Sequence, residues 1–121
     1  MRRRFALAAA FILAAPAIAP ALAVEDVEGL WKRPNGDTVT ASVVDGKLNC
    51  AITAGSYPGF EMCHGMVKQG DVWTGSAMKH PDMASVLSFN GTVIVFGDEL
   101  KIKGCAMADA FCDAETWTRA Q

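Results

Sequence analysis

The sequence has few basic residues once its first four positions are set aside. Three of its 11 Lys and Arg residues are Arg2, Arg3 and Arg4, so a chain that begins at Val24 keeps 8 basic residues against 13 acidic ones, a net charge of −5. A protein that binds a polyanion usually carries a basic patch or stripe, and none is visible here. The composition therefore argues against nucleic acid and against anionic membranes as the main partner.

Sequence motifs typical of common enzyme classes are also missing. Neither a G-x-S-x-G nucleophile elbow nor a Gly-rich phosphate loop occurs. The two histidines, His64 and His80, lie beside Gly65 and Pro81 in expected loops. Several acidic residues fall at expected turns, which explains them without any chemistry: Asp37, Asp45, Asp71, Asp82 and Asp98. We therefore expect a protein that is not an enzyme and that needs no cofactor.

Only the amino terminus carries a long hydrophobic run. Residues 1–23 show the three parts of a secretory signal peptide: three arginines, the apolar stretch Phe5–Ala15, and Ala21-Leu22-Ala23 as a cleavage site. Pro16 and Pro20 interrupt the run, which disfavours a permanent membrane anchor. We expect cleavage after Ala23, export to a bacterial periplasm without a stable membrane span, and one domain over residues 24–121.

Four cysteines follow this leader, and none of them forms a C-x-x-C pair. That absence disfavours a zinc site and a thioredoxin-like dithiol. An even number of cysteines in a small exported domain predicts two disulfides, for which three connectivities exist. Proximity in the sequence favours Cys50 with Cys63 and Cys105 with Cys112. Each short loop would stabilise the fold by roughly 2–3 kcal/mol.

The mature region shows no long helical period. It shows short runs of β-branched and aromatic residues separated by turn residues. Two dipeptides, Asp45-Gly46 and Asn90-Gly91, predict two-residue hairpins. We expect a long loop at Ala54–Gly65 and a short connection, one helical turn, at Met107–Cys112. The expected strands are Gly29–Arg33, Thr38–Val44, Lys47–Thr53, Asp71–Lys79, Ser85–Phe89, Thr92–Phe96, Glu99–Cys105 and Glu115–Arg119.

About eight strands with tight connections predict an all-β antiparallel meander, either a closed barrel or a sandwich. Closure removes unpaired strand edges, so we favour a small up-and-down barrel. In such a barrel the first and last strands are neighbours. The Arg119 guanidinium can then lie over the Trp31 indole and cover the closed end by a cation–π contact.

Several segments together resemble a known family. These are Trp73-Thr74-Gly75 followed by His80-Pro81-Asp82, then Leu100 to Cys105, Phe111-Cys112 and Thr116-Trp117-Thr118-Arg119. They resemble the domain of unknown function 2147 family, exported bacterial proteins with a lipocalin-like β-barrel. The resemblance covers most of residues 28–119 and implies a fold and a role in binding a small apolar ligand, not a reaction.

A barrel of this size either fills with side chains or holds one small ligand. We expect a small hydrophobic or amphipathic ligand, and no other partner is indicated. The candidate lining residues are aromatic and methionine side chains near the loops: Tyr57, Phe60, Met66, Trp73 and Met78.

Two alternatives stay open. Met62-Cys63-His64 with Met66, and Met78-Lys79-His80 with Met83, mix thioether and imidazole groups, which suit Cu(I). This metal hypothesis depends on the two clusters meeting at one barrel mouth, which the sequence does not show. The second alternative is a structural envelope protein with a filled barrel and an exposed apolar patch. The oligomeric state does not follow from the sequence.

Overall fold

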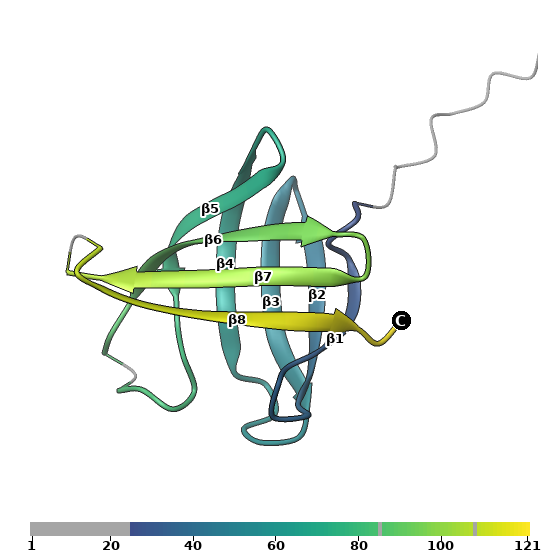
Figure 1. Cartoon of the computed structure of the whole chain (residues 1–121), viewed down its shortest axis with the longest axis horizontal. Helices are drawn as coiled ribbons and strands as arrows, with labels where there is room; N and C mark the ends of the chain where they lie inside the picture. Colours follow the sequence, from purple (N-terminus) through teal and green to yellow (C-terminus); the bar gives the residue numbers. More distant parts are fainter. Residues whose placement is uncertain (1–24, 85, 108) are drawn as a thin grey trace, which may run out of the picture.

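The protein is a closed antiparallel barrel in which every strand pairs with its neighbours in chain order. The computed structural model describes residues 25–84, 86–107 and 109–121, so the expected leader, residues 1–23, lies outside the described residues. The strands are β1 (Gly29–Lys32), β2 (Thr38–Val44), β3 (Lys47–Ala54), β4 (Glu61–Gln69), β5 (Val72–Met78), β6 (Phe89–Phe96), β7 (Glu99–Ala106) and β8 (Phe111–Arg119). In Figure 1, β6, β7 and β8 cross in front of β2, β3 and β4 at a steep angle.

The all-β class, the up-and-down order and closure are confirmed. The described residues contain no helix. Asp45 and Gly46, with φ of 52° and 75°, form the two-residue turn expected between β2 and β3. Both disulfides follow the connectivity favoured by proximity: Cys50 pairs with Cys63 between β3 and β4, and Cys105 with Cys112 between β7 and β8.

The predicted hairpin at Asn90-Gly91 is wrong. Residues 89–96 form one strand, in which Gly91 pairs with Gly75 of β5 on one side and with Gly104 of β7 on the other. Neighbouring atoms pack closely against these three glycines. A Cβ at position 91 would collide with the Met78 Sδ and with the Lys103 carbonyl oxygen. Gly91 is therefore required by close packing inside a strand rather than by a turn.

The predicted loop at Ala54–Gly65 is too long, because β4 already begins at Glu61. Met62 and Cys63 are consecutive buried residues, since the register of β4 against β3 shifts at this point. Gly65 has a φ of 62° and donates its N–H to the Asn49 side chain. A bulge of this kind breaks the period of two by which a strand is recognised in a sequence.

The last strand is longer than predicted. It begins at Phe111 rather than Glu115, so the expected Met107–Cys112 connection is shorter, and its described residues, 107 and 109–110, form a turn and no helix. The expected number of eight strands is nevertheless that of the structure, because two errors cancel. The prediction divides β6 into two strands at Asn90-Gly91 and omits β4.

One end of the barrel is sealed by residues 25–28 together with Trp31 and Arg119. Trp31 pairs in register with Arg119, whose guanidinium carbon lies 4.2 Å from the indole centroid. The Trp31 indole N–H donates to the Val27 carbonyl at 2.8 Å, and Arg119 donates to the carbonyls of Asp26 and Glu28. The contact expected at the closed end is therefore present, and the segment before β1 is part of it.

The opposite end carries the four connections that are longer than two residues, which follow β1, β3, β5 and β7. The connections after β5 and β7 both project at the left of Figure 1, away from the carboxyl terminus. The barrel interior between the two ends is filled by buried side chains: Trp31, Val39, Leu48, Ile52, Met66, Trp73, Val93, Leu100 and Trp117.

Candidate functional site

Strand β8 directs two carboxylates into the open end of the barrel. Side chains alternate between the two faces of a strand. Trp117 is fully buried in the core, so Glu115 and Asp113 project toward the same interior. The Glu115 side chain is 16% exposed and that of Asp113 is 53% exposed, which places Asp113 nearer the solvent. An acidic row therefore runs from the core to the mouth.

Glu115 is held by donors from three parts of the chain. Arg33 contributes two hydrogen bonds, from Nε at 3.1 Å and from Nη2 at 2.7 Å. The Trp117 indole N–H donates at 2.8 Å. Burial alone would raise the pKa of Glu115, but the hydrogen bonds from Arg33, Trp117 and His80, with the Arg33 charge, outweigh it and hold the pKa below its ordinary value.

Arg33 also joins this cluster to Asp37. Its Nη1 lies 3.1 Å from an Asp37 oxygen, and both side chains are about 95% buried. The Ser56 backbone N–H donates to the other Asp37 oxygen at 2.9 Å, and this bond, with those from Asn35 and Arg33, keeps the pKa of Asp37 low. The hydrogen bond to Glu115 keeps the pKa of Arg33 above its ordinary value. The charges are thus paired within the barrel.

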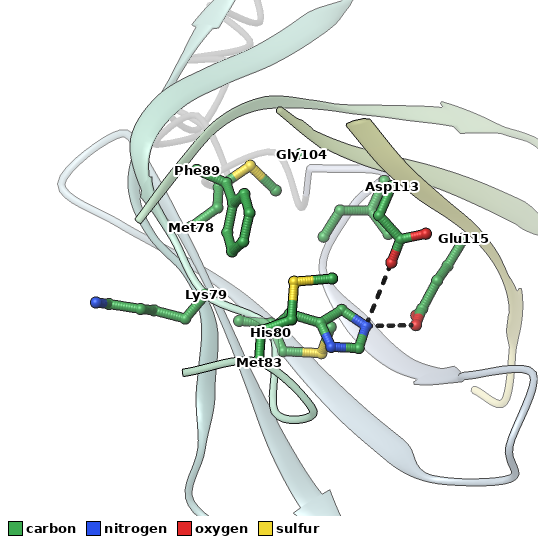
Figure 2. A pocket seen from close by; sticks show the side chains of 10 residues that line it. Met78, Lys79, His80, Met83, Phe89, Gly104, Asp113 and Glu115 are labelled. Carbon is green, nitrogen blue, oxygen red and sulfur yellow. Dashed lines mark hydrogen bonds and ion pairs between the residues drawn. The ribbon is translucent and has the colours of Figure 1, made fainter. Parts of the chain in front are cut away.

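His80 covers this cluster from the β5–β6 loop. Figure 2 shows its ring edge directed at two carboxylates, with Nε2 3.3 Å from Glu115 and 3.6 Å from Asp113. Its Nδ1 accepts the backbone N–H of Asp82 at 3.1 Å. This acceptance leaves Nε2 as the nitrogen that carries the proton toward the carboxylates.

An apolar cavity of about 40 Å³ lies beside His80. Figure 2 shows Met78 and Phe89 on one side of it and Met83 near the imidazole. The full lining is Met62, Met78, Lys79, His80, Met83, Phe89, Ile102, Gly104, Asp113 and Glu115. Pockets for drug-sized ligands are roughly ten times larger. The barrel interior is therefore filled, and this cavity has room only for an ion or one or two waters.

A wider apolar groove of about 430 Å³ opens at the mouth next to the cavity. The cavity and the groove share Met83, Phe89 and Asp113. The rest of the groove comes from the β5–β6 and β7–β8 connections and from the adjoining ends of β7 and β8: Leu87, Ala106, Met107, Ala110, Phe111 and Cys112. Met107 is 75% exposed and Phe111 64%, so a solvent-facing apolar surface adjoins the acidic row.

The structure does not bring the five predicted ligand-lining residues together. Only Met78 lines the cavity. Met66 and Trp73 are buried in the core, and Phe60 packs against the core from the β3–β4 loop. Tyr57 is 61% exposed in that same loop.

The two Met/His clusters meet in part. Met62 of the first cluster lines the same cavity as Met78, His80 and Met83 of the second. His64 does not join them, since its side chain is 62% exposed and lies 3.2 Å from Glu61. Among the described residues there is no group of three His, Cys, Asp or Glu side chains placed to hold a metal ion.

Sequence reasoning missed Arg33, Asp113 and Glu115. A signal was present, because Arg33 lies two positions after Trp31 and Glu115 two positions before Trp117. On a strand this spacing places a charge on the same face as a core tryptophan. The expected start of the last strand at Glu115 hid the pattern, since it left Asp113 in a connection.

Fold and site together define a small disulfide-bonded β-barrel with one sealed end and a polar cluster at the other. Residues 31–119 match the model of a family described as an uncharacterized protein conserved in bacteria, domain of unknown function 2147. The chain therefore belongs to this family. No curated protein and no solved structure matches it. Its paired cysteines are typical of exported proteins in an oxidising compartment. In the part of the chain that the structure describes, no helix has the length and apolarity to cross a membrane.

Proposed function

We propose that the protein is a non-enzymatic periplasmic binding protein for a small amphipathic molecule, and that it binds this molecule at the open mouth of the barrel rather than inside it. The observation that carries the proposal is the continuity of the apolar groove with the acidic row at Asp113. The volume of about 430 Å³ lies within the range of small-molecule sites.

The groove favours a ligand with a positively charged head. Asp113 is half exposed where the groove meets the cavity, and its side-chain contact there is with His80, at 3.6 Å. Glu115, by contrast, is already paired with Arg33. An ammonium group near Asp113 gains an opposite charge that is partly shielded from water, whereas a carboxylate there would be repelled. The apolar tail would cover Leu87, Met107 and Phe111, whose exposure marks a binding surface.

A non-catalytic role is supported by the composition of the cavity. Among the described residues that line it, none is a Ser, Thr or Cys that could act as a nucleophile. His80 is engaged at both nitrogens, and Glu115 is engaged by Arg33 and Trp117. The hydrogen bonds of His80 and Glu115 are thus made to other residues of the protein, which supports a structural role for both side chains.

Three probes with the same twelve-carbon chain test this proposal: dodecylamine, dodecanol and dodecanoate, each titrated calorimetrically below its micelle concentration or, for the alcohol, below its solubility limit. We expect saturable binding with the amine at least about tenfold tighter than the carboxylate, because one charge contact at a shielded site corresponds to roughly 1.4 kcal/mol. Equal affinity for all three probes would contradict the choice of head group, and binding of none would contradict the proposed function.

Phe111→Ala and Phe96→Ala form a matched pair of variants. Phe111 lines the groove and is 64% exposed, whereas Phe96 lies outside it and is 62% exposed. We expect Phe111→Ala to weaken amine binding about tenfold by removing apolar contact area, and Phe96→Ala to leave it unchanged. Asp113→Asn should abolish the preference for the amine over the alcohol, with Asp71→Asn as its exposed control. Equal effects within either pair would count against the mouth as the binding site.

A further inference from the structure

Three of the five methionines that follow the expected leader line one cavity. Met62 lies near the start of β4, Met78 ends β5, and Met83 lies in the β5–β6 loop. Met62 and Met78 are 2% and 3% exposed, and Met83 is 37% exposed. Three separate parts of the chain therefore bring methionines to the wall of the same small space, which His80 also lines. Figure 2 shows two of them, Met78 and Met83, with His80.

We infer that this cavity is a binding site for a soft monovalent cation, Cu(I) or Ag(I), with the thioethers of Met62, Met78 and Met83 as ligands and His80 as an additional ligand. Thioether sulfur and imidazole nitrogen are the donors that such ions prefer. A cavity of about 40 Å³ has room for one ion but not for an organic molecule.

Two further features favour a cation here. Asp113 lines the same cavity, so its carboxylate supplies negative charge next to neutral sulfur ligands, whereas the charge of Glu115 is balanced by Arg33. All four cysteines are in disulfides, so the chain has no thiolate to bind the ion elsewhere. His80 would bind the ion through Nε2, which then releases its proton to solvent and gives up its hydrogen bond to Glu115, while Nδ1 keeps the Asp82 N–H.

This inference does not depend on the proposed amphipathic ligand. The two sites share Met83, Phe89 and Asp113, but Met62 and Met78 belong to the cavity alone. Variants at Met62 and Met78 therefore test the metal site, and variants at Phe111 test the groove. Failure of one proposal leaves the other measurable.

The test uses protein from a periplasmic extract, labelled with ¹³C at the methionine methyl groups and titrated with silver nitrate in chloride-free buffer. Silver needs no reductant, so the disulfides stay intact. We expect one Ag(I) per chain and shifts of the methyl resonances of Met62, Met78 and Met83. The Met66 and Met107 resonances should stay in place, because neither residue lines the cavity.

The double variant Met62→Leu with Met78→Leu should weaken Ag(I) binding at least a hundredfold, while Met107→Leu serves as a control and should not change it. Leucine for methionine is close to volume-conserving, so the fold is expected to persist, which near-ultraviolet circular dichroism would verify. His80→Ala should weaken binding less than the double variant, and His64→Ala not at all. Shifts of Met107 equal to those of Met83, or unchanged affinity in a folded double variant, would overturn the inference.

Discussion

At the scale of single residues, the ion pair between Arg33 and Glu115 sets the character of the open end. The Arg33 side chain is 4% exposed and that of Glu115 16%, and their closest atoms are 2.7 Å apart. Removing a charge from water is costly, and the cost is offset only where hydrogen bonds replace the lost solvent. Here Asp37 and Trp117 complete the set of partners, so the breaking of any one contact leaves a buried charge without its full compensation.

We predict that Glu115→Gln lowers the free energy of unfolding by about 2–3 kcal/mol at pH 7, since it leaves Arg33 undercompensated. The pKa of Glu115 in the folded protein is below its ordinary value of 4.5, so its stabilising effect is full above that pH and is lost as the pH falls below it. The difference between the two proteins should therefore shrink below pH 4.5. Urea unfolding followed by tryptophan fluorescence at several pH values measures both effects.

Glu99→Gln is the control for this substitution, because Glu99 is exposed at the start of β7. It should change the unfolding free energy by less than about 0.5 kcal/mol. A cost at Glu115 no greater than at Glu99, or a cost that stays constant down to pH 3, would show that the buried ion pair does not stabilise the fold.

At the scale of strands, a row of glycines shapes the wall of the cavity. Gly75, Gly91 and Gly104 are in register across β5, β6 and β7. With no Cβ atoms in this row, the Met78 side chain can lie directly against the backbone of Gly91, and Phe89 can approach Gly104. The positions of Met78 and Phe89, which line the cavity, thus depend on the absence of Cβ atoms at Gly91 and Gly104.

We predict that Gly91→Ala lowers the free energy of unfolding by about 2–3 kcal/mol, because the new methyl group would overlap both the Met78 Sδ and the Lys103 carbonyl oxygen. Gly104→Ala is the graded control, since its Cβ would meet only the Phe89 side chain, at 3.2 Å. Gly104→Ala should lower the free energy of unfolding clearly less than Gly91→Ala does. Thermal unfolding of the two variants measures the difference, and equal costs would contradict the role assigned to this close contact.

At the scale of the whole molecule, the barrel has two unlike ends. Residues 25–28 and Arg119 seal one of them over Trp31, while the other holds the charged cluster, the cavity and the apolar groove. Because the barrel is closed, no strand has an unpaired edge. The exposed apolar surface at the mouth is therefore not the edge of a sheet. Binding is therefore expected at one end only.

We predict that the protein released by osmotic shock from a bacterial host begins at Val24 and has an intact mass four hydrogens below that of the reduced chain, as two disulfides require. Substituting both cysteines of either pair by alanine should destabilise the fold by about 2–3 kcal/mol. Intact mass spectrometry of shock fluid and of the remaining cells gives the result. Recovery of the uncleaved chain in the membrane fraction would contradict export as a soluble, processed protein.

Much of the fold follows from local patterns in the sequence. The alternation in Leu48, Cys50 and Ile52 predicts a strand with one buried face, and the structure buries all three. Asp45-Gly46 predicts its turn because few other residues adopt positive φ readily. Such signals are local, since they depend on a few neighbouring residues. Where the backbone departs from a period of two, as at the β4 bulge beside Gly65, the same signals fail.

The sequence by itself determined the all-β class, most of the turns and strands, and the membership of a bacterial family over residues 31–119. Only the tertiary structure decided which inward-facing residues meet. Met62 and Met83 line one cavity and Arg33 and Glu115 form an ion pair, although the members of each pair are far apart in the chain. Both arrangements depend on how the strands and their connections are placed around the closed barrel. Alternation indicates which face a residue occupies, but the stagger of the strands sets its height in the barrel, and therefore its neighbours.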